Sequence, residues 1–150
     1  MKAFLRLALL ALCLPFAAHA AEPTEKDAVA MAQKALAYAK ANGTDKLVAE
    51  VNAKNPEFVQ GELYVVIVNA TDGTHLAHPI NQKLVGLNTV EMQDVDGREF
   101  GKDMLDLARS SGKGWVGYMF KNPVTNKVAR KKSYIEKSGN IYAVAGIYTR

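Results

Sequence analysis

Lys131 is the residue whose chemistry depends most on where the fold places it. If its side chain points into an apolar pocket, the ammonium group is costly to bury without a partner. A carboxylate ligand would supply that partner through a charge-assisted hydrogen bond. Lys131 is also the middle residue of the basic run Arg130-Lys131-Lys132, and edge strands commonly carry solvated lysines. The residues alone leave both roles open.

Three aromatic residues, Trp115, Tyr118 and Tyr134, are candidates to line such a pocket. Large amphipathic side chains can form the wall of a small cavity, and Tyr118 can donate a hydrogen bond from its hydroxyl. All three are equally compatible with ordinary core packing. Strand alternation places Trp115 and Tyr118 on opposite faces, and it separates Lys131 from Tyr134 in the same way. The four cannot all face one pocket unless a strand bulges.

His78 and Met104 complete the set of candidate ligand-binding residues. The imidazole of His78, just before Pro79, could hydrogen-bond a ligand or the backbone of the following segment. His75 is three residues earlier, and on an extended segment we expect the two rings to face opposite sides, which disfavours a metal pair. Met104, like Met92, could line irregular apolar space or belong to the core. We expect no metal site and no cofactor.

The sequence contains no recognisable catalytic constellation. It has a single cysteine, Cys13, and no Gly-x-Ser-x-Gly motif, so neither a thiol nor a serine nucleophile is indicated. Asp94 and Asp96 with Gly97 resemble the start of a calcium loop, but the later bidentate acid is not at the required spacing, which favours a turn. We predict that the protein is not an enzyme.

The first twenty residues have the pattern of a secretion signal. Lys2 and Arg6 precede an apolar run at 7–18, and a small-x-small pattern ends at Ala20. The run is about a dozen residues, whereas a membrane span needs roughly twenty. We therefore predict a signal peptide at 1–20, cleavage before Ala21, and a periplasmic or secreted mature protein.

Residues 21–150 are about the length of one domain with a single core. The formal charge of the whole chain is +4, and it falls to +2 when Lys2 and Arg6 leave with the signal, so charge does not indicate a nucleic-acid partner. Because Cys13 also lies in the signal, the mature domain can form no disulfide. A domain of this size without cysteine suits a bacterial periplasm.

Periodicity and turn residues predict an α+β domain with an antiparallel sheet. Thr24 and Asp27 resemble a helix capping box, Asn42-Gly43 should end that helix, and Thr44 can cap a second, short one. The apolar run at 63–68 predicts a central strand buried on both faces. Residues 79–98 predict a long irregular segment with at most one helical turn, and such loops are often functional. The other expected elements are a third helix at 99–111 and strands at 74–77, 115–121, 128–137 and 141–148.

Several turn and strand motifs occur in an order that resembles one known family. They are Asp72-Gly73, Leu76-Ala77-His78-Pro79, Leu84-Val85-Gly86, Asp94-Val95-Asp96-Gly97, Gly114-Trp115-Val116-Gly117-Tyr118, Asn122-Pro123, Lys131-Lys132-Ser133-Tyr134-Ile135 and Ala145-Gly146-Ile147-Tyr148. On these residues the chain is similar to the type 2 single Cache family of extracytoplasmic sensor domains. The match in order and spacing extends along nearly the whole mature chain.

The resemblance implies a PAS-like fold, with a long N-terminal helix packed behind the sheet and a small-molecule pocket in front. It also implies a small organic acid as the ligand, of the acetate, propionate, pyruvate or lactate class. The ligand-binding residues that we expect on this basis are His78, Met104, Trp115, Tyr118, Lys131 and Tyr134.

Two features depart from the usual family pattern. The sequence ends two residues after Tyr148, so we expect the domain to signal, for example in chemotaxis, through a separate membrane receptor or histidine kinase. A tryptophan pair often found before the last strand is also missing, and Tyr142 stands near the place of the second. An interaction or scaffold domain without a ligand stays an alternative.

Overall fold

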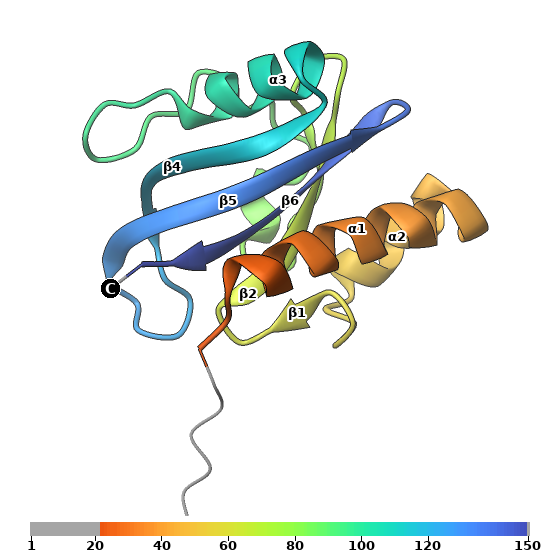
Figure 1. Ribbon diagram of the computed structural model, residues 1–150, viewed down its shortest axis with the longest axis horizontal. Coiled ribbons are helices and arrows are strands. Elements are labelled where there is room, and N and C mark those ends of the chain that lie inside the picture. Colours follow the sequence, from red (N-terminus) through yellow and green to blue (C-terminus); the bar gives the residue numbers. More distant parts are fainter. Residues whose placement is uncertain (1–21, 150) are drawn as a thin grey trace, which may run out of the picture.

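The computed structural model describes residues 22–149, which form one antiparallel sheet with helices on both faces (Figure 1). The strands are β1 (Val59–Gln60), β2 (Leu63–Asn69), β3 (His75–Ala77), β4 (Lys113–Lys121), β5 (Val128–Ser138) and β6 (Ile141–Tyr148). The helices are α1 (Glu25–Asn42), α2 (Thr44–Asn52) and α3 (Phe100–Ser110), with a 3-10 turn, η1 (Gln82–Leu84). The strand order is β1-β2-β6-β5-β4, and β3 pairs with β2. The predicted α+β class and antiparallel sheet are confirmed.

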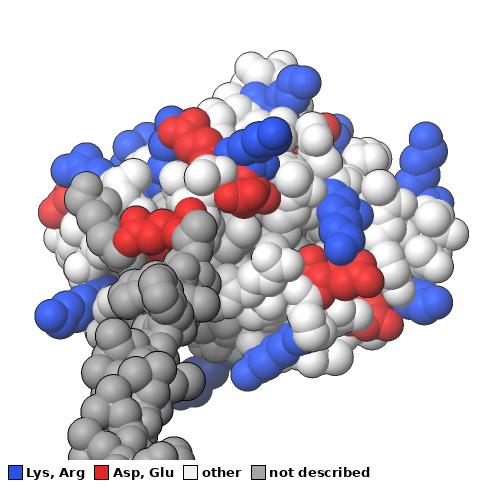
Figure 2. Space-filling model, turned by 60° about the horizontal axis from the view of Figure 1, so that its bottom comes forward, with Lys and Arg blue, Asp and Glu red and all other residues white. Residues whose placement is uncertain are grey.

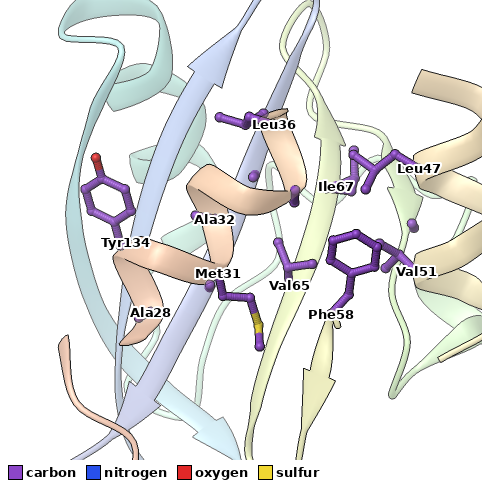
Figure 3. Packing of buried hydrophobic residues seen from close by; sticks show 14 of the residues in the cluster. Ala28, Met31, Ala32, Leu36, Leu47, Val51, Phe58, Val65, Ile67 and Tyr134 are labelled. Atoms are coloured by element: carbon purple, nitrogen blue, oxygen red, sulfur yellow. The ribbon is translucent and has the colours of Figure 1, made fainter. Parts of the chain in front are cut away.

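The two N-terminal helices cover one face of the sheet (Figures 1 and 3). The predicted capping box starts α1: the Asp27 N–H donates to the Thr24 hydroxyl (3.3 Å) and the Thr24 N–H donates to the Asp27 carboxylate (2.8 Å). The apolar side of α1, with Met31 and Ala32, then packs against the sheet residue Val65 in one buried cluster. This is the long helix behind the sheet that a PAS-like domain requires.

The opposite face of the sheet carries α3 and the long segment at 79–99. Phe100, Met104 and Leu105 of α3 pack in a second buried cluster with Val66 and Val144 of the sheet. Because β2 alternates between the two clusters, its side chains are buried on both faces, as the apolar run predicted. The sheet is therefore a wall between two separate cores.

The last three strands form the predicted meander. β4 pairs with β5 from Lys113↔Glu136 to Lys121↔Val128, and β5 pairs with β6 from Lys131↔Tyr148 to Ser138↔Ile141. Neither ladder contains a register shift, so neighbouring residues alternate strictly between the two cores. This regularity decides which candidate residues meet.

Two details differ from the sequence predictions. Gly43, with φ of 90°, occupies the N-cap of α2, and no side chain caps that helix; Thr44 is its first residue. The short strand β1 before Gly61 was not predicted, because two residues carry too little periodicity to reveal a strand. The predicted signal peptide lies outside the described residues.

Candidate functional site

Lys131 and Tyr118 face the same core because they are cross-strand partners. The β4–β5 register pairs Tyr118 with Lys131 and pairs Trp115 with Tyr134. Partners in an antiparallel ladder project from the same face, and residues three apart along a strand project from opposite faces. Tyr118 and Lys131 therefore point to the α3 face, whereas Trp115 and Tyr134 point to the α1 face.

A cavity of about 40 Å³ lies on the α3 face, between the sheet and its cover. Its floor is the sheet, and α3 and the segment at 79–99 close it from the other side. Four of the six predicted ligand-binding residues line it: His78, Met104, Tyr118 and Lys131. The remaining lining residues are Tyr64, Val66, Val68, His75, Leu84, Thr89, Met92, Phe100, Gly101, Phe120, Tyr142 and Val144.

Lys131 carries the cationic group of this cavity. Its side chain is 3% exposed, and its Nζ donates to the Tyr64 hydroxyl at 2.8 Å while lying 4.0 Å from the centre of the same ring. Burial lowers the pKa of Lys131 to about 7, an effect that the charge of Glu62 partly opposes. Near neutral pH this amine is therefore able to gain or lose a proton.

Gly146 of β6 lets the Lys131 side chain reach the cavity. A Cβ at position 146 would lie 2.9 Å from Lys131 Cε and 2.2 Å from the Ser133 hydroxyl oxygen. The Ser133 hydroxyl is itself hydrogen bonded to the Tyr118 hydroxyl at 3.0 Å. The absence of a side chain at 146 thus leaves room for two polar groups that the sheet places side by side.

Three tyrosines lie beside the Lys131 side chain: Tyr64, which accepts a hydrogen bond from the amine, and the cross-strand partners Tyr118 and Tyr148. The Tyr148 hydroxyl donates to the Lys121 carbonyl at 2.9 Å, and burial raises the pKa of Tyr64, Tyr118 and Tyr148 well above the ordinary value. These phenols are therefore neutral hydrogen-bonding groups. They satisfy polar atoms around the amine without neutralising its charge.

His75 and His78 both face the cavity, which corrects the expectation that their rings point to opposite sides. The rings are stacked with centroids 6.0 Å apart, because β3 ends at Ala77 and the chain turns before Pro79. His78 Nδ1 accepts from the Asn81 N–H at 3.0 Å. Burial lowers the pKa of His75 to about 4 and of His78 to about 3, so both imidazoles are neutral at pH 7.

The cover of the cavity is apolar and aromatic. Phe100, at the start of α3, stacks on Tyr118 with ring centroids 4.4 Å apart and an interplanar angle of 7°. Thr89 contributes a hydroxyl 2.7 Å from His75 Nδ1, and Met92 fills the space beside it. An apolar cover strengthens every electrostatic interaction beneath it, because it excludes water from the amine.

Trp115 and Tyr134 do not line this cavity. Their rings lie 5.3 Å apart on the α1 face, where Tyr134 belongs to the buried cluster under α1 and Trp115 packs against it. The Tyr134 hydroxyl donates to Glu136 at 2.6 Å. The prediction that these two residues line the same pocket as Lys131 therefore does not hold for this cavity, because strand alternation turns them to the other face of the sheet. Trp115 instead borders a surface hollow of about 320 Å³ beside β4.

A wider hollow, a groove of about 820 Å³, lies beside the first turns of α1 and β1. It is open to solvent, and two of its charged side chains, Lys34 and Glu57, form an ion pair at 3.0 Å. Figure 2 shows basic and acidic side chains interspersed on the surface in that view. We therefore centre the candidate site on the smaller, enclosed cavity around Lys131.

Residues 24–147 match the family described as single Cache domain 2. The chain belongs to this family. The resemblance read from its turn motifs is thus confirmed, as is the PAS-like architecture of the Cache domain. No curated protein sequence matches it, and no helix among residues 22–149 is long and apolar enough to cross a bilayer.

Solved structures with the same fold include sensor domains. A methyl-accepting chemotaxis protein from Vibrio parahaemolyticus superposes with a TM-score of 0.69 at 20% identity, covering 82% of this chain and 86% of that one. A periplasmic sensor domain of a chemotaxis protein gives 0.64 at 19%, with 83% and 90% covered. A Cache chemosensory domain studied for carboxylic acid recognition gives 0.65 at 20%, with 83% and 88% covered.

Several lining residues of the Cache cavity were not singled out from the sequence. Tyr64 and Phe120 lie within apolar strand runs, where a core role is the ordinary reading. The alternation of Tyr64, Val66 and Val68 along β2 is a signal that could have placed Tyr64 on one face. Which face held the cavity was not readable from that pattern.

Proposed function

We propose that this Cache domain is a periplasmic sensor module that binds a small organic acid, with the Lys131 ammonium group holding the carboxylate. The observation that carries the proposal is a buried amine in an enclosed cavity, hydrogen bonded to a neutral phenol. Burial disfavours the ammonium charge of Lys131, and a carboxylate beside it would stabilise that charge. Such a charge-assisted bond is about twice as strong as one between neutral groups.

The size of the cavity limits the ligand. About 40 Å³ is available, and a single water needs roughly 10–15 Å³ on this measure, so the space suits a molecule of a few heavy atoms. Acetate and propionate are of this size, and pyruvate and lactate are slightly larger. The apolar lining from Val66, Val144 and Phe100 favours a short alkyl group over a second charge.

The fold supports a signalling role for the bound state. The solved structures that resemble this domain include sensor domains of chemotaxis proteins. We propose that the domain presents its acid-bound form to a separate membrane receptor or kinase. Cross-linking to membrane proteins of the native host with and without the acid would test this step; equal cross-linking in both conditions would contradict it.

A thermal-shift screen of residues 21–150 tests the ligand class. Acetate, propionate, pyruvate and lactate are the test compounds, with amino acids and amines as controls. A ligand at one hundred times its dissociation constant stabilises the folded state by about 2.7 kcal/mol, which a melting curve resolves. We expect a shift with a subset of the acids and with none of the amines.

Matched lysine variants identify the group that binds. Lys131→Met keeps an unbranched apolar side chain one atom shorter, removes the charge and should abolish the shift. Lys132→Met, one residue further on and facing the α1 side, should keep it, because Lys132 pairs with Glu25 on the surface (2.7 Å). If no compound shifts the wild type, the proposal fails and an interaction domain without a ligand is favoured.

A further inference from the structure

Any ligand of the Lys131 cavity needs a part of the protein to move. The polar residues that would meet it are almost fully enclosed: Tyr64 is 2% exposed, His78 3% and Lys131 3%. The sheet below is a continuous hydrogen-bonded ladder, and opening it would break many bonds at once. The movable part must therefore belong to the cover, formed by residues 79–99 and α3.

The first part of the cover is firmly attached to the hairpin beneath it. The His75 N–H donates to the Leu87 carbonyl at 3.0 Å, and the Gly86 N–H donates to the His75 carbonyl at 2.8 Å. The side chain of Asn88 donates to the Asp72 carbonyl at 2.8 Å. These bonds hold the cover to β3 up to residue 88.

Two glycines fix the next residues of the cover. A Cβ at Gly101 of α3 would lie 2.2 Å from the Thr89 carbonyl oxygen, and a Cβ at Gly73 would lie 2.3 Å from Val90 Cγ2. Thr89 therefore packs directly against the backbone of Gly101, and Val90 packs directly against the backbone of Gly73. The cover is anchored up to Val90, and a change of position has to begin after it.

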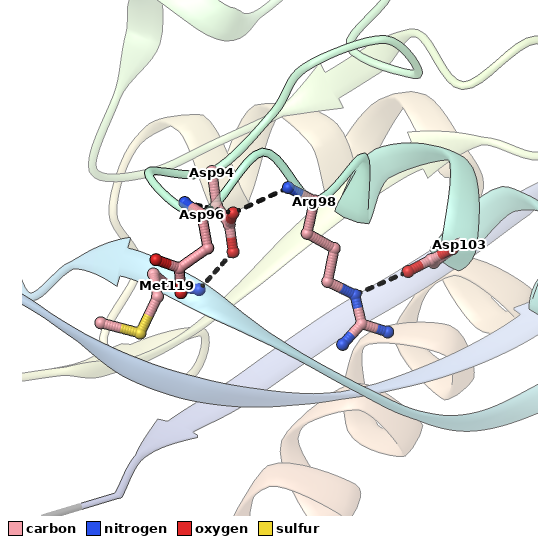
Figure 4. Close-up of polar contacts among 5 residues, drawn as sticks. All are labelled: Asp94, Asp96, Arg98, Asp103 and Met119. Atoms are coloured by element: carbon pink, nitrogen blue, oxygen red, sulfur yellow. Dashed lines mark hydrogen bonds and ion pairs between the residues drawn. The ribbon is translucent and has the colours of Figure 1, made fainter.

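Residues 91–98 have few attachments. Val95 is 69% exposed, and within the described residues one hydrogen bond joins this segment to the sheet. In that bond the Met119 N–H of β4 donates to Asp94 Oδ2 at 2.8 Å (Figure 4). At its far end the segment is tied to α3 by the ion pair of Arg98 with Asp103 at 2.8 Å.

The Asp94 carboxylate also organises the segment that it attaches. Its Oδ1 accepts from the N–H groups of Asp96 and Arg98, both at 2.9 Å (Figure 4). The bond from the Met119 N–H, followed by those from the Arg98 and Asp96 N–H groups, lowers the pKa of Asp94, so the carboxylate is ionised at neutral pH. One side chain thus both shapes residues 94–98 and fastens them to the edge of β4.

The attachment lies next to the cavity. Met92 lines the cavity two residues before Asp94, and Phe120 lines it directly after Met119. We propose that Asp94 is a latch that holds residues 91–98 over the cavity, and that release of its bond to Met119 sets the rate at which ligand enters and leaves. The role in ligand exchange rests on the proposed function, whereas the latch itself does not.

A latch has a kinetic signature that a binding residue lacks. Asp94 is not a lining residue of the cavity, so weakening the latch should raise the open population in both the free and the bound protein. Association and dissociation rates then rise together, and their ratio, the dissociation constant, changes little. Loss of a ligand contact would instead raise the dissociation rate alone.

Hydrogen exchange without any ligand tests the latch first. Asp94→Asn removes the charge and one hydrogen-bond acceptor. Because a hydrogen bond to a charged group is stronger than one between neutral groups, its loss should speed exchange of the Met119 amide by about tenfold. Asp96→Asn is the matched control, because Asp96 contributes its backbone N–H to this network. Equal exchange of the Met119 amide in wild type and Asp94→Asn would overturn the proposal.

Propionate exchange measured by NMR line shapes or stopped flow tests the role of the latch. We expect both rate constants to rise about tenfold in Asp94→Asn and to stay unchanged in Asp96→Asn. A higher dissociation rate alone, or unchanged rates despite faster amide exchange, would overturn that role. If neither propionate nor another acid binds, the proposed function fails, and the amide exchange still decides whether the latch exists.

Discussion

At the Lys131 amine, burial and ligand binding act on the same proton. Burial in the cavity lowers the pKa to about 7, and a neighbouring carboxylate favours the protonated form. His78 and His75, the other titratable bases that line the cavity, are neutral at this pH. Glu62 is the carboxylate whose charge acts on the amine in the free domain. Binding of an acid anion should therefore be accompanied by uptake of a proton.

We predict that acid binding to the domain weakens above pH 7. Below pH 7 the amine of the free protein is already protonated, so the affinity is nearly constant. Above it, binding has to add a proton, and the dissociation constant should rise by about tenfold per pH unit. Calorimetric titrations in buffers of different ionisation enthalpy measure both the affinity and the proton uptake. An affinity independent of pH between 6 and 9 would contradict this role of Lys131.

At the scale of elements, the cavity exists because three neighbouring strands cooperate. β5 supplies Lys131 and Ser133, β4 supplies Tyr118, and β6 supplies the empty space at Gly146. The regular register brings these residues together without a bulge. The position of one missing side chain is therefore as important to the site as the side chains that are present.

We predict that Gly146→Ala destabilises the domain and weakens acid binding. The added methyl would lie 2.2 Å from the Ser133 hydroxyl and 2.9 Å from the Lys132 carbonyl oxygen, and such overpacking costs about 1–3 kcal/mol. Gly117→Ala in β4 is the matched control, since the nearest atom to its added Cβ is 3.9 Å away. Urea unfolding of both variants is the measurement; equal stability of the two would show that β6 adjusts to the methyl.

At the scale of the whole molecule, the sheet separates two cores with different chemistry. The core under α1 is built of apolar residues such as Val65, Phe58 and Leu47 (Figure 3). The core under α3 contains the buried bases of the cavity. Stability therefore depends on pH mainly through the second core. Protonating the imidazoles there would place charge in a buried site and destabilise the fold.

We predict that the free domain loses stability as the pH falls from 6.5 towards 4. An unfolded histidine has a pKa of about 6.5, whereas the pKa is about 4 for His75 and about 3 for His78 in the fold. Over this range the unfolded state binds more protons, so the free energy of unfolding decreases with decreasing pH. Melting temperatures between pH 7 and 4 measure the slope. His75→Gln should make it shallower; an unchanged slope would assign the loss to other groups.

The sequence by itself determined the main helices and strands, their order and the antiparallel character of the sheet. Apolar runs of strand length, the capping box at Thr24 and the turns at Gly73 and Gly139 are local signals, and each acts through a few neighbouring residues. The family followed from the same turns. The predicted signal peptide and its cleavage before Ala21 also rest on local pattern, and they stay predictions that the intact mass of the exported protein would test.

Only the tertiary structure decided which candidate residues meet. Alternation showed that Trp115 and Tyr118 face opposite sides, but it could not say which side holds the cavity, because both faces of the sheet are covered. The space left by Gly146 and the turn that brings His75 beside His78 depend on residues distant in the chain or on a break in strand geometry. Burial, and with it the lowered pKa of Lys131, is a property of all the surrounding elements together.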